Sequence, residues 1–265
     1  MELRDKVIVV TGAARGIGLG LCKRFAQESP QAIVMSDLEC SSIVAAAESV
    51  GGEAVTCDVS LEEQVQRLVN DTLDKHGRID LFCANAGIVL SGGVHASNDE
   101  WQRVMDVNFT SHLYSTRAVL PSMLERGEGC LMHTASAAGL LTSIGSASYA
   151  VSKHAAVAFA EWVSITYGNR GIQVACLCPQ GVDTDMIKGG DPLSQFLQQQ
   201  ALSTEQVAED VVTALREKRF LILPHGEVSR FLQNRASDHE RWLKGMRKIN
   251  RELLGGHDSI GDVEP

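Results

Sequence analysis

Short apolar runs rich in β-branched residues alternate along this chain with longer stretches whose apolar residues recur at helical spacing. The short runs predict buried strands, and the longer stretches predict helices that cross from one strand to the next. The expected strands cover residues 7–10, 32–36, 54–57, 79–84, 129–135, 172–178 and 220–223. The expected helices cover residues 16–28, 39–50, 61–76, 99–125 and 147–169. This order predicts an α/β fold, a doubly wound, Rossmann-type seven-stranded parallel sheet with helices on both faces.

Two stretches interrupt the alternation. Residues 180–200 contain Gly189-Gly190, then Asp191-Pro192 and a glutamine-rich tail. This composition predicts a mobile loop with a short helix, placed where a lid over a site would lie. Residues 227–254 form a charged helical pattern beyond the last expected strand, which predicts a C-terminal helical extension.

The C-terminal extension carries a single apolar stripe on a basic helix. Trp242, Met246, Ile249 and Leu253 recur at helical spacing, and arginines and lysines occupy the other faces. The stripe needs a surface other than the chain's own sheet, because an apolar face left in water favours aggregation. That surface is either a neighbouring subunit or the chain's own lid region, and the sequence leaves both open.

The composition is that of an ordinary globular protein. Of 265 residues, 44% are hydrophobic and 22% charged, and the formal net charge is −9. We expect one domain over residues 1–265, with a core at about 6–224 and the extension at about 227–255. An acidic chain offers no basic field to a nucleic acid, so we expect no nucleic-acid partner.

The termini and the cysteines bear on the compartment. The first residues are charged and lead directly into a strand pattern, and no run reaches the length of a membrane span, so we expect a cytoplasmic protein without a membrane partner. The seven cysteines form no repeated CxxC and no cluster with histidine. We therefore expect free thiols and no metal site.

A glycine-rich turn follows the first expected strand. The strand runs directly into TGAARGIG, in which Gly12, Gly16 and Gly18 precede a helix. Glycines at such a junction let main-chain N–H groups approach a pyrophosphate, and the helix dipole favours its negative charge. The spacing GxxxGxG differs from the common GxGxxG, so its position after the first strand of a doubly wound sheet carries the argument.

An acidic residue ends the second expected strand. Asp37 stands nineteen residues after Gly18, where a carboxylate accepts hydrogen bonds from both hydroxyls of an adenosine ribose and repels a 2′-phosphate. This predicts NAD rather than NADP, although Arg15 in the glycine turn could approach a 2′-phosphate. The alternative is that Asp37 only caps the next helix.

Further polar groups end the third and fourth expected strands. Asp58 follows the third strand, and Asn85-Ala86-Gly87 close the fourth. Both lie at the carboxyl edge of the sheet, where ligands bind in such folds. Each could instead cap the turn that follows it, and for Asp58 alone the two interpretations are equally balanced.

Together these motifs resemble the short-chain dehydrogenase/reductase family. TGxxxGIG, the strand-end aspartate, the NAG tripeptide and the YxxxK of YAVSK occur in the family's order from about Lys6 to Leu223. The resemblance implies a catalytic set of Asn108, Ser136, Tyr149 and Lys153. It also implies cofactor contacts from Gly12, Arg15, Gly16, Ile17, Gly18, Asp37, Asp58, Val59, Asn85, Ala86, Gly87, Tyr149, Lys153, Val182 and Thr184.

The spacing of Tyr149 and Lys153 agrees with an acid/base role. A phenol titrates near pH 10, so proton exchange at pH 7 needs a shift of about 3 pH units, roughly 4 kcal/mol. An ammonium about 4 Å away at an effective dielectric near 20 supplies that order of energy, and one helical turn brings the two side chains together. By the resemblance, Ser136 polarises the substrate oxygen, Lys153 holds the nicotinamide ribose, and Asn108 holds a water that relays protons.

Two departures from the family pattern stand out. The family's Pro-Gly after the sixth strand is here Pro179-Gln180, so we expect the Gln180 side chain to reach toward the active site and alter the loop. Thr134-Ala135 ahead of Ser136 are also unusual, although the reacting hydroxyl is kept.

The sequence as a whole predicts an oxidoreductase that transfers a hydride between NAD(H) and a secondary alcohol or ketone, with Tyr149 as acid/base. By the resemblance we expect a homodimer or homotetramer. Two alternatives stay open: an NADPH-dependent 3-oxoacyl-thioester reductase, against which the acidic Asp37 counts, and a non-catalytic dinucleotide sensor, which would have little need for all four reacting groups.

Overall fold

The computed structural model describes residues 1–189 and 192–255. Seven parallel strands form one sheet in the order β3-β2-β1-β4-β5-β6-β7. The strands are β1 (Val7–Thr11), β2 (Ala32–Asp37), β3 (Glu53–Thr56), β4 (Leu81–Ala84), β5 (Gly129–Thr134), β6 (Ile172–Leu177) and β7 (Leu221–Ile222). The α-helices are α1 (Gly16–Ala26), α2 (Cys40–Val50), α3 (Glu62–His76), α4 (Asn98–Met105), α5 (Ser111–Arg126), α6 (Ala147–Tyr167), α7 (Pro192–Gln198), α8 (Thr204–Arg216), α9 (Glu227–Ser237) and α10 (His239–Leu254). The expected doubly wound sheet is confirmed.

Both faces of the sheet are covered because successive strand residues point to opposite sides. In β1, Val9 belongs to one hydrophobic cluster, whereas Ile8 and Val10 belong to the other. The first cluster packs under α3, α5 and α6, and the second under α1, α2 and α8. Strands buried on both faces read as continuous apolar runs, which is why the sequence pattern located them.

The strand order reverses between β1 and β4. From β1 the chain winds outward to β2 and β3, then returns to β4 and winds the other way, with Val10 opposite Cys83. At such a reversal the connections leave the carboxyl ends of two adjacent strands in opposite directions and open a crevice between them. The glycine turn and the NAG tripeptide follow these two strand ends.

Two expected helices differ in detail. The helix expected at 99–125 is interrupted by a π-helical turn, η1 (Asp106–Thr110), between α4 and α5. The helix expected at 227–254 is two helices, because Asp238 adopts an extended backbone and its carboxylate accepts the N–H of Arg241 at 2.9 Å as the cap of α10. Apolar periodicity does not register either break, since a π turn and a one-residue cap barely change it.

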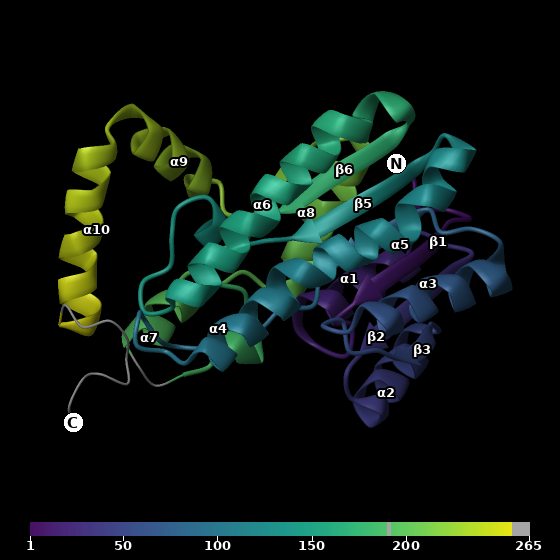
Figure 1. Cartoon of the computed structure of the whole chain (residues 1–265), viewed down its shortest axis with the longest axis horizontal. Helices are drawn as coiled ribbons and strands as arrows, with labels where there is room; N and C mark the ends of the chain where they lie inside the picture. Colours follow the sequence, from purple (N-terminus) through teal and green to yellow (C-terminus); the bar gives the residue numbers. More distant parts are fainter. Residues whose placement is uncertain (190–191, 256–265) are drawn as a thin grey trace.

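The loop expected at 180–200 contains a 3₁₀ turn, η4 (Asp185–Ile187), and α7. Gly190 and Asp191 lie outside the described residues. Beyond this loop, α9 and α10 extend from the sheet as an arm, and α10 stands beside α7 (Figure 1). The arm is anchored at its far end, since Leu254 is 2% exposed.

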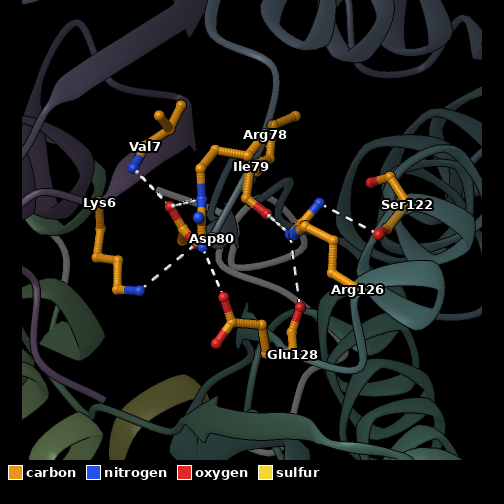
Figure 2. Close-up of polar contacts among 8 residues, drawn as sticks. All are labelled: Lys6, Val7, Arg78, Ile79, Asp80, Ser122, Arg126 and Glu128. Atoms are coloured by element: carbon orange, nitrogen blue, oxygen red, sulfur yellow. Dashed lines mark hydrogen bonds and ion pairs between the residues drawn. The ribbon is translucent and has the colours of Figure 1, made fainter.

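The opposite edge of the sheet, where the strands begin, is held by a buried carboxylate (Figure 2). Asp80, at 1% exposure, accepts the main-chain N–H of Val7 at 2.9 Å. Its oxygens also accept from the guanidinium of Arg78, and the ammonium of Lys6 lies 3.8 Å away. Asp80 therefore joins the starts of β1 and β4 at the edge far from the crevice.

The cysteines are free thiols, and all except Cys40 are buried. Burial raises the pKa of Cys57 to about 11, so this thiol is protonated at neutral pH. Over the described ranges, no helix combines the length and the apolar character that crossing a membrane requires.

Candidate functional site

A cleft of about 1520 Å³ opens at the carboxyl ends of the strands. Every residue expected to hold the cofactor lines it, as do Ser136, Tyr149 and Lys153. Asn108 is the exception and does not line the cleft. The fold thus brings together side chains and main-chain groups that are spread from residue 12 to residue 184.

The glycine turn is built against the NAG tripeptide. Gly12 has a φ of 64°, and a Cβ there would lie 2.7 Å from Cα of Ala86, so only glycine fits. Thr11 completes the joint, because its hydroxyl accepts the main-chain N–H groups of Asn85 at 3.0 Å and Ala86 at 3.1 Å. These contacts fix the end of β4 beside the end of β1.

The N-terminus of α1 faces the cleft without a side-chain cap. Arg15 is the N-cap residue and makes no capping hydrogen bond, while Gly16, Ile17 and Gly18 line the cleft. Uncapped N–H groups at the positive end of a helix dipole bind anions. A Cβ on Gly16 would lie 3.2 Å from Cγ2 of Thr184, which places the loop after β6 beside this turn. These residues fit the pyrophosphate of a dinucleotide.

Asp37 lies at the end of β2 with its carboxylate in the cleft. One oxygen accepts the N–H of Ala14 at 3.0 Å, and the other accepts the N–H of Leu38 at 2.8 Å. Each carboxylate oxygen keeps a further lone pair for a ribose hydroxyl. Asp37 also fixes the glycine turn through Ala14, so its role is wider than the helix cap considered from sequence.

Asp58 takes the turn-capping arrangement. Its carboxylate accepts the main-chain N–H of Ser60 at 2.9 Å and the Ser60 hydroxyl at 2.6 Å. The same residue lines the cleft, and Val59 beside it is buried. The two interpretations of Asp58 are therefore compatible: the cap holds the strand end at the wall of the cleft.

Tyr149, Lys153 and Ser136 lie close together. Lys153, at 3% exposure, places Nζ 5.7 Å from the centroid of the Tyr149 ring and donates to the carbonyl of Thr134 at 3.0 Å. Ser136 accepts the N–H of Ala138 at 3.1 Å and donates to the carbonyl of Pro179 at 3.3 Å. The same hydroxyl lies close enough to Tyr149 to oppose the rise in the pKa of the tyrosine.

The expected depression of the tyrosine pKa is not found. Burial raises the pKa of Tyr149 above its usual value, opposed by the hydrogen bond to Ser136. Burial also lowers the pKa of Lys153 to about 8. The sequence argument counted the attraction between the two charges and omitted the cost of removing both groups from water, which is the larger effect here.

The side chain of Asn108 hydrogen-bonds to neighbouring parts of the chain and does not line the cleft. It lies in the π turn η1 and is fully buried. Its side-chain oxygen accepts the N–H of Ile88 at 2.8 Å, and its amide donates to the carbonyl of Ile88 at 2.9 Å and to the hydroxyl of Ser152 at 3.1 Å. These bonds agree with the backbone-pairing alternative, and the water-holding role implied by the resemblance stays a prediction.

Sequence reasoning missed several supporting residues. Ser152 joins Asn108 to α6, since its hydroxyl also donates to the carbonyl of Tyr149 at 2.9 Å. Thr11 lies inside TGAARGIG and Ser152 inside YAVSK, and this position in a motif is the sequence signal that could have identified them. His225 had none: it is buried after β7, and its Nδ1 accepts the N–H of Gln180 at 3.2 Å. Gln180 lines the cleft, as expected.

No group of histidines, cysteines and carboxylates with metal-binding geometry occurs within residues 1–189 and 192–255. The polar side chains that line the cleft include the hydroxyls of Ser136 and Tyr149, the ammonium of Lys153 and the strand-end carboxylates of Asp37 and Asp58, and these groups suit a dinucleotide and proton transfer.

Comparisons with known proteins agree with this arrangement. A sequence model described as short chain dehydrogenase matches residues 6–192. A 1-deoxy-11-beta-hydroxypentalenate dehydrogenase of Streptomyces exfoliatus is 34% identical over 247 residues, covering 90% of each chain. A 3-oxoacyl-[acyl-carrier-protein] reductase of Chlamydia pneumoniae is 32% identical over 191 residues, covering 70% of this chain and 77% of its own. A short-chain dehydrogenase/reductase of Burkholderia phymatum, solved in complex with NAD, is 27% identical with a TM-score of 0.83, covering 91% of this chain and 96% of its own.

Proposed function

Because the chain belongs to the short-chain dehydrogenase/reductase family, and is therefore an oxidoreductase, we propose that it transfers a hydride between NAD(H) and a secondary alcohol or ketone. One observation carries the proposal. Ser136, Tyr149 and Lys153 lie in the same cleft as the glycine turn and Asp37, so a dinucleotide held at its phosphates and ribose reaches the proton-transfer groups.

Bound NAD supplies the hydride acceptor when an alcohol is oxidised. Ser136 orients the alcohol oxygen by hydrogen bonding, and Tyr149, as the phenolate, takes the alcohol proton and becomes the phenol. The Lys153 ammonium near the ring stabilises the phenolate before this transfer, and in ketone reduction it stabilises the phenolate that remains once the proton has been donated. Asn108 acts as a positioning residue, because it fixes Ile88 and, through Ser152, the helix that carries Tyr149.

The preference for NAD over NADP rests on Asp37. Its carboxylate lies in the cleft at the end of β2, held by two main-chain N–H groups. A 2′-phosphate there would meet a fixed negative charge. The neighbours Leu38 and Glu39 supply no cation, so Asp37 outweighs Arg15 in this proposal.

The thioester reductase is the second candidate, and the 32% identity to the Chlamydia reductase favours it. An acyl-carrier protein is acidic and needs a basic entrance, whereas this chain has a net charge of −9. A sensor without activity is the third candidate, and the retained cluster of Ser136, Tyr149 and Lys153 counts against it.

Formation of NADH from NAD, followed by absorbance over a panel of secondary alcohols, tests the proposal. Oxidation of at least one alcohol is expected, with NADP a poorer cofactor. Reduction of a 3-oxoacyl thioester with NADPH and no alcohol oxidation would favour the second candidate. Binding of NAD without turnover of any alcohol or ketone would favour the sensor.

A further inference from the structure

The lining of the cleft extends beyond the residues expected to hold the cofactor and includes the space between α7 and α10. We call this space the outer pocket, and its walls include Leu193 and Phe196 of α7 and Trp242, Met246, Ile249 and Leu253 of α10. These four α10 residues are the apolar stripe recognised in the sequence. The stripe therefore faces the chain's own cleft, in agreement with the lid alternative, and the subunit contact stays a prediction.

Helix α10 is held in place at both ends. At its start, Asp238 caps the helix and Trp242 packs against the core cluster that contains Val228. At its end, Leu254 is buried, and a Cβ on Gly145 would lie 3.3 Å from Leu254 Cδ1 and 3.5 Å from Leu193 Cδ2. Helix α10 thus forms a wall of the cleft and ends against the loop that leads into α6.

The size of the cleft leaves room for a second ligand beside a dinucleotide, and its lining indicates that this ligand is apolar. Its volume of about 1520 Å³ exceeds the roughly 300–1,000 Å³ of a typical single-ligand pocket. Phe196 and Ile249 remain 45% and 37% exposed although they face this space. Apolar side chains gathered at one opening mark a binding surface, and a small alcohol would leave them in water.

We propose that the substrate is a large, mainly apolar secondary alcohol or ketone whose apolar body lies between α7 and α10. This inference rests on the proposed function for its reaction and on the outer pocket for its substrate class. Each CH₂ group buried against these walls is expected to raise kcat/KM about fourfold, equivalent to about 0.8 kcal/mol, until the walls are covered.

A homologous series from butan-2-ol to decan-2-ol, together with bicyclic secondary alcohols, tests the substrate class. kcat/KM is expected to rise steeply with apolar size in at least one of the two series, and the two series distinguish an extended from a compact body. NADH formation with no dependence on size would overturn the inference and leave the proposed function intact. Calorimetric measurement of decan-2-one binding separates the two failures. If decan-2-one binds but no alcohol of either series forms NADH, the result supports the pocket and contradicts the proposed function.

Gly245 offers a sharper test. It lies on the cleft side of α10, and a Cβ there would meet no atom within 4 Å. Gly245→Leu therefore has room for its Cβ, adds an apolar side chain on the cleft side of the helix and replaces a helix-interior glycine, which favours folding. The matched control is Lys244→Ala, an exposed residue on the opposite face.

Gly245→Leu is expected to lower kcat/KM for decan-2-ol about tenfold or more, the scale of one misplaced side chain in an apolar pocket. Butan-2-ol turnover and the melting temperature should not fall, and Lys244→Ala should change neither. Equal effects on both alcohols, or none, would contradict the inference. A change of mass in light scattering with unchanged selectivity would assign the stripe to a subunit contact and also contradict it.

A second, independent observation concerns Gln180. Its main chain is fixed, because its N–H donates to His225 and the preceding carbonyl of Pro179 accepts from Ser136 and, at 2.8 Å, from the N–H of Ala137. Its side-chain oxygen is buried and has no hydrogen-bond partner among the described residues. A buried acceptor without a donor is costly, and a ligand that brings a donor recovers that cost.

We infer that Gln180 is a specificity-determining residue that accepts a hydrogen bond from an O–H or N–H of the bound ligand, next to the reacting carbon. The donor is either a second hydroxyl of the substrate or the carboxamide of the nicotinamide. Both have the same chemistry, and their effects on kinetics differ.

Gln180→Met keeps the length of the side chain and removes the acceptor, whereas Gln180→Glu keeps an acceptor. If the donor is on the substrate, the methionine variant is expected to lose about tenfold or more in its preference for a diol over the matched mono-alcohol, with an unchanged Kd for NAD. If the donor is the carboxamide, the Kd for NAD rises and the preference does not change. The glutamate variant should restore the affected quantity, and no change in either quantity in the methionine variant would overturn the inference.

Discussion

The ammonium of Lys153 lies over the ring of Tyr149, 5.7 Å from its centroid, and donates to the main-chain carbonyl of Thr134 at 3.0 Å. The main chain of β5 thus holds the cation near the phenol ring. Burial lowers the pKa of Lys153 to about 8 and raises that of Tyr149. The buried ammonium of Lys153 therefore destabilises the folded state, and it lies where it can stabilise the phenolate form of Tyr149.

This arrangement predicts an unusual pH dependence of stability. The folded pKa of Lys153, about 8, lies below its unfolded value of 10.5. Between these values the unfolded state binds the proton and the folded state does not, so stability rises with pH. Burying the charged lysine lowers the unfolding free energy by roughly 3 kcal/mol below pH 8, and this loss disappears toward pH 10.5.

Lys153→Met should remove this dependence, because it keeps the side chain's volume without its charge. The unfolding free energy of the wild type minus that of the variant should rise by roughly 2 kcal/mol between pH 7 and pH 10 in urea titrations. The buried thiols of Cys22, Cys57, Cys83 and Cys130 are not coupled to Lys153, so their titration affects both proteins equally. A difference that stays constant or falls over this range would show that the ammonium is not destabilised by burial.

Asp37 is expected to decide the choice of cofactor. Asp37→Ala removes the charge that opposes a 2′-phosphate, so the ratio of kcat/KM for NAD to that for NADP should fall. It also removes the acceptor of the Ala14 N–H, so activity with NAD should decrease. Asp58→Ala is the matched control, since it alters a neighbouring strand end. A wild-type enzyme that prefers NADPH would refute this assignment and favour the thioester reductase.

Asp80 is expected to matter for stability and not for the site. Removing one member of a buried ion pair leaves the others unsatisfied and costs about 3–5 kcal/mol, here including the N–H of Val7. Asp80→Ala should therefore lower the unfolding free energy by about 3 kcal/mol. Glu62→Ala breaks the exposed pair with Arg117 and should cost less than about 1 kcal/mol. Equal losses in the two variants would contradict the account of Asp80.

The fold could be predicted from the sequence because strands buried on both faces appear as apolar runs, and the motifs mark where these runs end. Residues whose main chain faces the cleft, such as Gly12 and Gly16, could be located because their conformation leaves few alternatives. The lengths of the strands and the breaks at η1 and Asp238 could not, since local periodicity is the same on both sides of each break.

Three features of the site depend on tertiary structure. The pKa values of Tyr149 and Lys153 are governed by burial, which spacing in the sequence does not contain. The side chain of Asn108 accepts a hydrogen bond from the main chain of Ile88, twenty residues away. The buried His225 reaches Gln180 across forty-five residues. Each feature is set by groups that meet only after the chain has folded.

The central claim is that Tyr149 is the acid/base of a hydride-transfer enzyme. Tyr149→Phe removes one hydroxyl and leaves the glycine turn, Asp37 and Lys153 in place, so the most direct measurement is kcat of this variant beside its Kd for NAD. With the best alcohol of the panel, kcat should fall about 100-fold or more, the scale of general acid–base catalysis, while the Kd for NAD changes by less than about threefold. Lys153→Ala, in contrast, should weaken both quantities. A Tyr149→Phe enzyme that keeps more than about a tenth of the wild-type kcat would contradict the claim.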